Sequence, residues 1–359
     1  CGSGRIYDGT FSRKLTDGDG VAAALLKEQG YHVIGATMRL WTYSDSCNMK
    51  HEGCCAESAV EDARRVCDKL GIDFYVMNFK DMFKDKVVDY FVDEYIHGRT
   101  PNPCIACNKY LKFDALLKKA LAMGIDYVAT GHYAKIEKGE DGKYILRASE
   151  AVKKDQSYVL YNFTQEQLAH TLMPLGGYNK DWVRQKAEEL GLGVAHKPDS
   201  QEICFVEDDD YAKFITDYSG YKPKEGDILD VNGNVIGKHR GLIYYTIGQR
   251  KGIGAYGRPM FVMKIDAENN TITLGEKGME FSNELTAYDV NFVSGEFPKE
   301  NMLITAKVRY QAPPAAAMLC PQKDGTVKLM FPEPQRAVTP GQAVVFYDGD
   351  IVLGGGTVL

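Results

Sequence analysis

Helical and strand-like patterns alternate along the first third of this chain, and the alternation limits the folds that it can adopt. The helical patterns cover residues 21–29, 59–70 and about 107–121, and the strand patterns cover residues 31–40, 72–79 and 125–136. This order predicts an α/β fold with a parallel, doubly wound sheet. Ligands bind beyond the carboxyl ends of the strands in such sheets, and residues 130–133 lie at one of these ends.

The second half of the chain changes from helical to strand patterns. Residues 151–206 still contain two helical stretches, at about 165–172 and 182–190. From Tyr221 onward, short strands separated by glycines replace the helices, and Asn232-Gly233 predicts a β-hairpin. The strands of the last part of the chain have the spacing of a β-barrel.

Length and composition favour a globular protein of two or three domains. The chain has 359 residues, of which 44% are hydrophobic, so it can bury a sizeable core. The sequence has no apolar run of the roughly 18 residues that a membrane-spanning helix needs. The net charge of -6 gives no overall signature of nucleic-acid binding, although a local basic surface stays possible.

The nine cysteines lack the regular spacing of a secreted disulfide framework, so we expect a reducing cytoplasm. A mature lipoprotein also begins with a cysteine and a flexible stretch, as Cys1-Gly2-Ser3-Gly4 does. The remainder of the chain has the character of a cytosolic enzyme, which favours a cytoplasmic protein over a lipoprotein. Closely spaced cysteines in that compartment are catalytic or metal-binding more often than disulfide-bonded.

Three cysteines lie in two short signatures, TPNPCIACNKYLKF with Cys104 and Cys107, and HKPDSQEICFVEDDDY with Cys204. Pro101 and Pro103 hold the backbone extended, so we expect a helix to start at or just after Cys107. A thiol at the positive end of a helix dipole is favoured as the thiolate. The signatures therefore predict thiol chemistry.

Other interpretations of these residues stay open. The CxxC pair could be half of a zinc site, but Cys54, Cys55 and Cys67 are the only nearby partners and their spacing is irregular. We derive no role for Cys54 and Cys55, and expect Cys67 and Cys320 to be buried packing residues.

The chain closely resembles the bacterial tRNA-specific 2-thiouridylases from about residue 21 to its end. The resemblance rests on seven strings in family order: GRTPNPCIACNKYLKF, ATGHYAKI, KDQSYVLY, KPDSQEICF, YYTIGQRKGIG, KVRY and TPGQAVVFYDGDIVLGGG. It implies an ATP pyrophosphatase domain of the adenine-nucleotide α-hydrolase type, a small central domain and a C-terminal β-barrel. We place these at residues 1–206, 207–280 and 281–359.

The resemblance implies ATP-dependent 2-thiolation of the wobble uridine, U34, in tRNAs for Lys, Glu and Gln. ATP, with Mg²⁺, adenylates the C2 oxygen, and an enzyme persulfide then supplies sulfur. By residue match Cys204 carries the persulfide and Cys107 is the partner thiol. A cysteine desulfurase or a sulfur-relay protein would be the donor, and the target base must leave its stack to reach the site.

Other roles follow from the same resemblance. The expected nucleotide contacts are Met38 and Gly131. The expected contacts with the target base or with the rest of the tRNA are Asn102, Pro103, His132, Lys154, Asp155, Gln156, Arg309, Tyr310 and Gln342. Without the resemblance, His132 would be read as a structural histidine, and Arg309 and Tyr310 as ordinary strand residues. Positive side chains in this set, such as Lys154, would contact phosphate and position RNA without reading its sequence.

The N-terminal segment departs from the family pattern. Residues 14–20 replace the family's pyrophosphate loop, Ser-Gly-Gly-Val-Asp-Ser-Ser, and residues 1–13 contain no convincing buried strand. Asp17 and Asp19 would repel phosphate unless a metal intervened. Either ATP binding is impaired or this N-terminus is not the native one, and the intact remainder of the site favours the second explanation.

Cys104 is the second departure, because many family members have aspartate there. With Cys107 and Cys204 it makes a set of three thiols, the ligands typical of iron–sulfur clusters. Related tRNA-thiolating enzymes hold a [4Fe–4S] cluster on three cysteines, so such a cluster is an alternative to the persulfide. A degenerate tRNA-binding protein and an amidotransferase-type synthetase are the other functional candidates, and the thiol pair argues against the synthetase.

Overall fold

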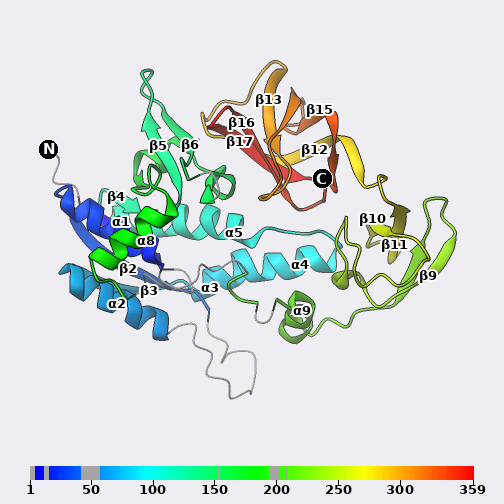
Figure 1. Ribbon diagram of the computed structural model, residues 1–359, viewed down its shortest axis with the longest axis horizontal. Coiled ribbons are helices and arrows are strands. Elements are labelled where there is room, and N and C mark those ends of the chain that lie inside the picture. The colour runs from blue at the N-terminus through cyan, green and yellow to red at the C-terminus, as the bar shows by residue number, and fades with distance from the viewer. Residues whose placement is uncertain (1–4, 12–15, 42–56, 152–153, 194–202, 207–208) are drawn as a thin grey trace.

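The computed structural model of this chain describes residues 5–11, 16–41, 57–151, 154–193, 203–206 and 209–359 (Figure 1). The predictions for residues 12–15, for Cys54 and Cys55, and for the segment before Ile203 lie outside these ranges. A parallel sheet with its helices occupies one end of the molecule in Figure 1, and a β-barrel and a smaller sheet occupy the other. Helices α4 (Tyr90–Ile96) and α5 (Pro103–Ala106) run between the two ends.

The parallel sheet confirms the predicted doubly wound α/β fold. Its strand order is β3-β2-β1-β4-β7, and every neighbouring pair is parallel. The strands are β1 (Arg5–Phe11), β2 (His32–Arg39), β3 (Asp73–Asn78), β4 (Tyr127–Ala129) and β7 (Thr171–Leu172). The chain order reverses between β1 and β4, so this is the point where a ligand crevice is expected.

Strand β1 was not expected, because residues 1–13 contain no convincing strand pattern. Arg5–Phe11 lies at the centre of the sheet and pairs with both β2 and β4. Its sequence RIYDGTF contains Asp and Gly, which weaken an isolated strand pattern. Pairing on both sides, which no local pattern reports, decides the conformation.

Helix α1 (Asp17–Glu28) begins four residues before the expected start at Val21. Thr16 and Asp19 form a capping box, in which the Thr16 hydroxyl accepts from the Asp19 amide and the Asp19 carboxylate accepts from the Thr16 amide. The first turn is polar in sequence but buried in the fold, so an apolar periodicity could not find it. Asp17 pairs with Lys180 of α8 (Lys180–Glu189) at 2.6 Å.

Helices cover both faces of the sheet. Helices α1, α2 (Glu57–Leu70) and α8 pack together through Val21, Val66 and Val183. The other face carries α3 (Lys80–Phe83), η2 (Lys84–Asp89), α4 (Tyr90–Ile96), α5 (Pro103–Ala106), η3 (Cys107–Ala115), α6 (Leu116–Ala122) and α9 (Tyr211–Ser219). The η2 and η3 segments are π-helical continuations of their neighbours.

The strand expected over residues 125–136 is two strands in two different sheets. It breaks at residues 130–133, so β4 stays in the parallel sheet, while β5 (Ala134–Lys138) and β6 (Tyr144–Ala148) form a hairpin. Strand β6 pairs with the last strand of the barrel at Arg147 and Ile351. The segment after the hairpin contains η5 (Ser157–Leu160) and α7 (Gln165–Ala169). Residues 130–133 therefore join the parallel sheet to the barrel sheet.

A small mixed sheet, with one parallel strand pair, and an antiparallel barrel complete the fold. The smaller sheet has the order β10-β11-β8-β9, and its β8–β9 pair confirms the predicted hairpin, with Gly233 at φ +85°. Its elements are β8 (Gly226–Leu229), β9 (Val235–His239), η6 (Leu242–Tyr244), β10 (Met260–Asp266) and β11 (Thr271–Glu276). Among the described residues, no helix combines the length and apolar composition that crossing a bilayer requires.

The barrel expected at the end of the chain is also confirmed. Six strands follow the order β12-β15-β14-β13-β16-β17, and a β12–β17 pairing closes the ring. They are β12 (Phe281–Phe292), β13 (Met302–Lys307), β14 (Ala315–Pro321), β15 (Val327–Arg336), β16 (Ala343–Asp348) and β17 (Ile351–Val358). The core of the ring is apolar, with Leu319, Leu329 and Phe346 fully buried.

The Asp17–Lys180 pair gives a stability prediction. The Asp17 side chain is buried and that of Lys180 is only 13% exposed, so Lys180→Met leaves a buried carboxylate without its cation and lowers the free energy of unfolding by about 3–5 kcal/mol. Asp17→Val combined with Lys180→Met restores most of the loss, because an apolar pair replaces the ion pair. Urea unfolding followed by Trp182 fluorescence in a Trp41→Phe background measures these differences.

Lys186→Met is the matched control, because Lys186 lies on the same helix and pairs with Glu28 at 3.1 Å near the surface. We expect it to cost under about 1 kcal/mol. Equal losses for Lys180→Met and Lys186→Met would contradict the role of the buried pair.

Candidate active site

The end of β4 meets the first turn of α1 at the switch point of the sheet. Gly131 follows β4 and lies so close to α1 that a Cβ atom there would be 2.8 Å from the Asp19 Oδ1 and 2.9 Å from the Gly18 carbonyl carbon. A side chain at residue 131 would therefore collide with the helix. Met38, the other residue expected at the nucleotide, is buried near the carboxyl end of β2.

Carboxylates occupy the start of α1, where a phosphate-binding loop would present its amides. The Asp19 Oδ2 accepts hydrogen bonds from the Thr16 hydroxyl at 2.8 Å and the Thr16 amide at 3.2 Å. Burial raises the pKa of Asp19 to about 6, against the effect of these hydrogen bonds and of the charge of Lys112. At neutral pH Asp19 is therefore mostly ionised and faces the position that an anion would take.

The helix that carries Cys104 and Cys107 begins earlier than expected. The Asn102 Oδ1 caps it by accepting from the amides of Cys104 at 3.1 Å and Ile105 at 3.4 Å, and Pro103 is its first residue. Cys104 is exposed in the first turn, whereas Cys107 is buried and begins the π-helical segment η3. The expectation of a start at Cys107 is wrong because the asparagine cap outweighs the extended preference before Pro103.

The expected thiolate character of Cys107 is also corrected. Burial raises the pKa of the Cys107 thiol to about 11, and the nearby thiol of Cys104 raises it further, while the charge of Lys112 lowers it. The pKa of Cys104 is raised by the protein atoms crowded around its sulfur, although solvent reaches the residue. Because Cys107 lies past the first turn, the helix dipole does not offset this burial. Both thiols are protonated at neutral pH.

Lys112 is the site residue that the sequence analysis missed. Its charge lowers the pKa values of Cys104, Cys107, His132 and Asp19, so it lies near all four groups. It lies five positions after Cys107, a spacing that an α-helix turns to different sides but that a π-helix brings closer to one side, because its hydrogen bonds join residues five apart. In the sequence Lys112 is only the second lysine of CNKYLKF. The π-helical geometry is what places it near the thiols.

His132 is held as a neutral imidazole. Burial, followed by the charge of Lys112, lowers the pKa of His132 well below its usual value. Its Nδ1 lies 2.7 Å from the Thr130 hydroxyl, and its ring lies 5.8 Å from that of Phe113. A neutral ring here can form hydrogen bonds with a base but supplies no positive charge for phosphate.

The segment with Cys204 packs against the same apolar cluster that contains Cys107. Phe205 anchors it, with its ring 5.2 Å from Phe91 and 5.7 Å from Phe83. The two cysteine signatures, which lie far apart in sequence, thus border the same apolar cluster. The described residues contain no group of three His, Cys, Asp or Glu side chains placed to hold a metal, so zinc and the [4Fe–4S] cluster gain no support from the geometry.

Residues 154–156, which are expected to contact tRNA, also form hydrogen bonds that hold the site. The Gln156 Oε1 accepts from the Tyr133 amide at 2.9 Å, and the Gln156 amide donates to the Tyr133 carbonyl at 2.9 Å. Asp155 accepts from Ser157 and Ser149, and the Tyr310 hydroxyl donates to the Asp155 carbonyl at 3.0 Å. The Lys154 amide donates to Ala151 at 2.7 Å. This segment therefore connects the end of β4 to the barrel.

Gln342 and Arg309 connect the barrel to the other units. The Gln342 Nε2 donates to the Thr100 carbonyl at 2.8 Å, just before Asn102. The Arg309 Nη2 donates to the Ile247 carbonyl at 3.2 Å and the Ala337 carbonyl at 2.6 Å. Five of the nine residues expected to contact the base or the tRNA thus link the segments around the site, a structural role that residue types alone do not reveal: Asp155, Gln156, Arg309, Tyr310 and Gln342.

Comparison with known proteins decides the family. The sequence matches family models described as the tRNA methyl transferase HUP domain over residues 17–208, the tRNA methyl transferase PRC-barrel domain over 212–276 and the aminomethyltransferase beta-barrel domain over 282–358. The tRNA-specific 2-thiouridylase MnmA of Acetivibrio thermocellus is 58% identical over 341 residues, which are 94% of this chain and 95% of that protein. This chain belongs to the tRNA-specific 2-thiouridylase family.

Members of the 2-thiouridylase family are tRNA sulfurtransferases. The member from Clostridioides difficile is 57% identical over 340 residues, which are 94% of each chain. A solved structure described as a 4-thiouridine synthetase–RNA complex with bound ATP has a TM-score of 0.35 and 17% identity, over 56% of this chain and 45% of that chain. A likeness at this TM-score carries no argument about function.

The protonated Cys107 gives a test within this 2-thiouridylase. Iodoacetamide should alkylate Cys107 at pH 8 about two orders of magnitude more slowly than in the unfolded protein, because only the thiolate reacts and the folded pKa is about 11. The rate should rise with pH without reaching a plateau before about pH 10. Lys112→Met should slow the reaction further. Peptide mass spectrometry measures the modified fraction.

Lys109→Met is the matched control, because Lys109 lies on the same helical segment but pairs with Asp289 at 2.6 Å. It should leave the alkylation rate of Cys107 unchanged. A plateau below pH 9, or equal rates in the two lysine variants, would contradict the assigned electrostatics.

Proposed function

We propose that this chain replaces the C2 oxygen of the wobble uridine, U34, by sulfur in tRNAs for Lys, Glu and Gln, at the expense of ATP. The observation that carries the proposal is the packing of the Cys204 segment against the cluster that contains Cys107. Paired thiols support sulfur transfer rather than the methyl transfer named in the descriptions of two family models. A cytoplasm that keeps thiols reduced suits this chemistry.

ATP would convert the C2 oxygen of the uridine into a better leaving group. A uracil carbonyl oxygen leaves poorly, so the C2 oxygen first attacks the α-phosphorus of ATP, and pyrophosphate departs with Mg²⁺. The nucleotide would lie at the switch point beside Gly131, with Met38 at the neighbouring strand end. Asn102 and Pro103 would contact the base, which must leave its stack to enter.

Sulfur reaches C2 through the two cysteines. A cysteine desulfurase or a sulfur-relay protein loads Cys204 with a persulfide, whose terminal sulfur attacks C2 while AMP leaves with the oxygen. Cys107 then attacks the inner sulfur of Cys204. The S–S bond breaks, its electron pair stays on the sulfur bound to C2, and a Cys107–Cys204 disulfide forms that a cellular thiol reductant must reduce. A disulfide requires Cα atoms within about 7 Å.

The charges of the site support this sequence of steps. Lys112 favours the thiolate that Cys107 must become, because its charge lowers the pKa of that thiol. His132 is neutral and can accept or donate a hydrogen bond to the base. Lys154 and Arg309, with Tyr310 and Gln342 of the barrel region, would position the RNA, mainly through its phosphates.

A second candidate, a tRNA-binding protein without adenylation, is favoured by one observation. The first turn of α1 carries the buried carboxylates of Asp17 and Asp19 where the family has its pyrophosphate loop. Asp17 is neutralised by Lys180, so Asp19 is the charge that opposes a phosphate. The two candidates differ in whether ATP binds.

Asp19 makes ATP binding depend on pH. Because the pKa of Asp19 is about 6, its carboxyl is mostly neutral at pH 5 and charged at pH 8, so ATP affinity should fall as pH rises through 6. Asp19→Ser should tighten Mg·ATP binding at pH 8 by at least about fivefold, since a like charge at about 4 Å costs about 1–4 kcal/mol. The gain should disappear toward pH 5. Isothermal titration calorimetry measures the ATP affinity of both proteins at each pH. The ratio of the two affinities removes the effect of the titration of ATP itself.

Glu28→Gln is the control for net charge, because Glu28 is at the opposite end of α1. It should leave ATP affinity unchanged. An equal gain for Asp19→Ser at pH 5 and pH 8 would show that the carboxylate charge is not what opposes ATP.

Thiolation of tRNA tests the function directly. Unmodified tRNA-Lys is incubated without oxygen with the protein, Mg·ATP, cysteine and a cysteine desulfurase, and wobble 2-thiouridine is measured by nucleoside mass spectrometry. We expect ATP-dependent product, and a loss of at least about a thousandfold in Cys107→Ser and Cys204→Ser. Cys320→Ser, in strand β14 of the barrel, should keep full activity.

Cys104 separates the two routes for sulfur. Cys104→Ala keeps activity if a persulfide carries sulfur, and loses it together with iron and an absorption band near 400 nm if a [4Fe–4S] cluster does. Bound tRNA without product or ATP binding would establish the second candidate instead.

A further inference from the structure

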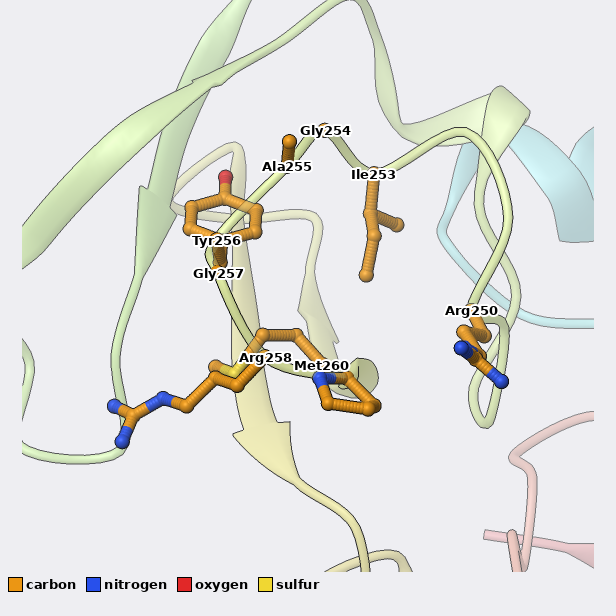
Figure 2. A pocket seen from close by; sticks show the side chains of 9 residues that line it. Arg250, Ile253, Gly254, Ala255, Tyr256, Gly257, Arg258 and Met260 are labelled. Carbon is orange, nitrogen blue, oxygen red and sulfur yellow. The ribbon is translucent and has the colours of Figure 1, made fainter.

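A basic pocket opens in the loop between η6 and β10 (Figure 2). Its volume is about 340 Å³, and its lining comes from residues 250–260. Figure 2 shows Arg250 and Arg258 on opposite sides of it, with the Tyr256 ring on a third. Arg250, Lys251 and Arg258 are exposed, and residues 248–260 contain neither Asp nor Glu. Positive charge is thus concentrated here in a chain whose net charge is -6.

The loop is held in a fixed shape at its base. The Gly248 amide donates to the Val262 carbonyl at 2.8 Å, which closes the two ends. The Gln249 Nε2 donates to the Lys251 carbonyl at 2.9 Å, and its Oε1 accepts from the Thr246 amide at 2.9 Å. The pocket is therefore organised before any ligand arrives, which lowers the entropy cost of binding.

Three exposed glycines leave the rim open to a close approach. Gly252, Gly254 and Gly257 have φ values of +76°, +96° and +70°, a region that other residues rarely adopt. A Cβ atom at Gly257 would meet nothing within 4 Å, so packing does not explain this glycine. Backbone of this conformation can form concave sites for anions.

The loop also continues the surface that leads to the thiols. Arg309 donates to the Ile247 carbonyl at the start of the loop, and the next residue, Tyr310, bonds to Asp155 beside the site. Adjacent residues of the barrel region thus contact the loop and the segment beside the site, which links the basic loop to the site across the junction between the barrel and the smaller sheet.

We propose that the loop of residues 250–258 binds phosphates of the RNA backbone while the target base is in the active site. The pocket is open and flanked by guanidinium groups, which suits a phosphodiester chain better than an enclosed small molecule. Arg258 exchanges its exposed ion pair with Glu276, at 2.7 Å, for phosphate. The proposal rests on the proposed function, because it requires bound tRNA.

Binding of an unmodified tRNA-Lys transcript, measured by fluorescence anisotropy at several salt concentrations, tests the loop. Arg250→Ala/Arg258→Ala should weaken binding roughly tenfold or more and lower the slope of log K against log salt by about 1 for each phosphate that the protein no longer neutralises. Arg250→Ala/Lys251→Ala, which keeps the Arg258–Glu276 pair, should act in the same direction. Arg64→Ala/Arg65→Ala removes two exposed charges from α2 and should change neither quantity.

The outcomes separate this proposal from the function itself. If the unaltered protein fails to bind tRNA, the proposed function fails. If it binds tRNA and the loop variants bind equally well with the same salt slope, the loop proposal is overturned and the function stands. Loss of Mg·ATP binding in the loop variants, with tRNA binding intact, would also overturn it, because the loop would then be a nucleotide site.

Discussion

The helical run that Asn102 caps is the element on which the remainder of the site depends. Its first turn exposes Cys104, and its π-helical continuation brings Cys107 and Lys112 closer to one side. Gln342 of the barrel holds the segment before the cap through Thr100, so the barrel fixes where the run begins. A shift of this start would move both thiols and the lysine together.

Burial sets the chemistry of this site more than helix dipoles do. It raises the pKa values of Cys107 and Asp19 and lowers that of His132, so each group is pushed toward its neutral form. Lys112 is the cation that acts on all of them. The protonated thiols of Cys104 and Cys107 therefore resist oxidation. A thiolate can form when bound substrate changes their surroundings.

Residues from all three structural units contribute to the hydrogen bonds and strand pairings around the site. Hairpin β5–β6 leaves the α/β unit and extends the barrel sheet, while residues 130–133 stay at the switch point. Tyr310 joins the barrel to Asp155, and Arg309 joins it to the loop of the smaller sheet. Hydrogen bonds between the units therefore connect the residues around the thiols to the barrel and to the smaller sheet.

The sequence by itself determined the α/β order, the Asn232-Gly233 hairpin, the barrel and the family, because periodicity, turn residues and motif strings are local properties. It did not reveal strand β1, whose weak pattern is decided by pairing on both sides. It also misjudged the Cys107 thiol and missed Lys112. The reason is physical: a pKa depends on desolvation, and a π-helix brings residues five apart closer to one side, so both were decided by how the chain packs around them.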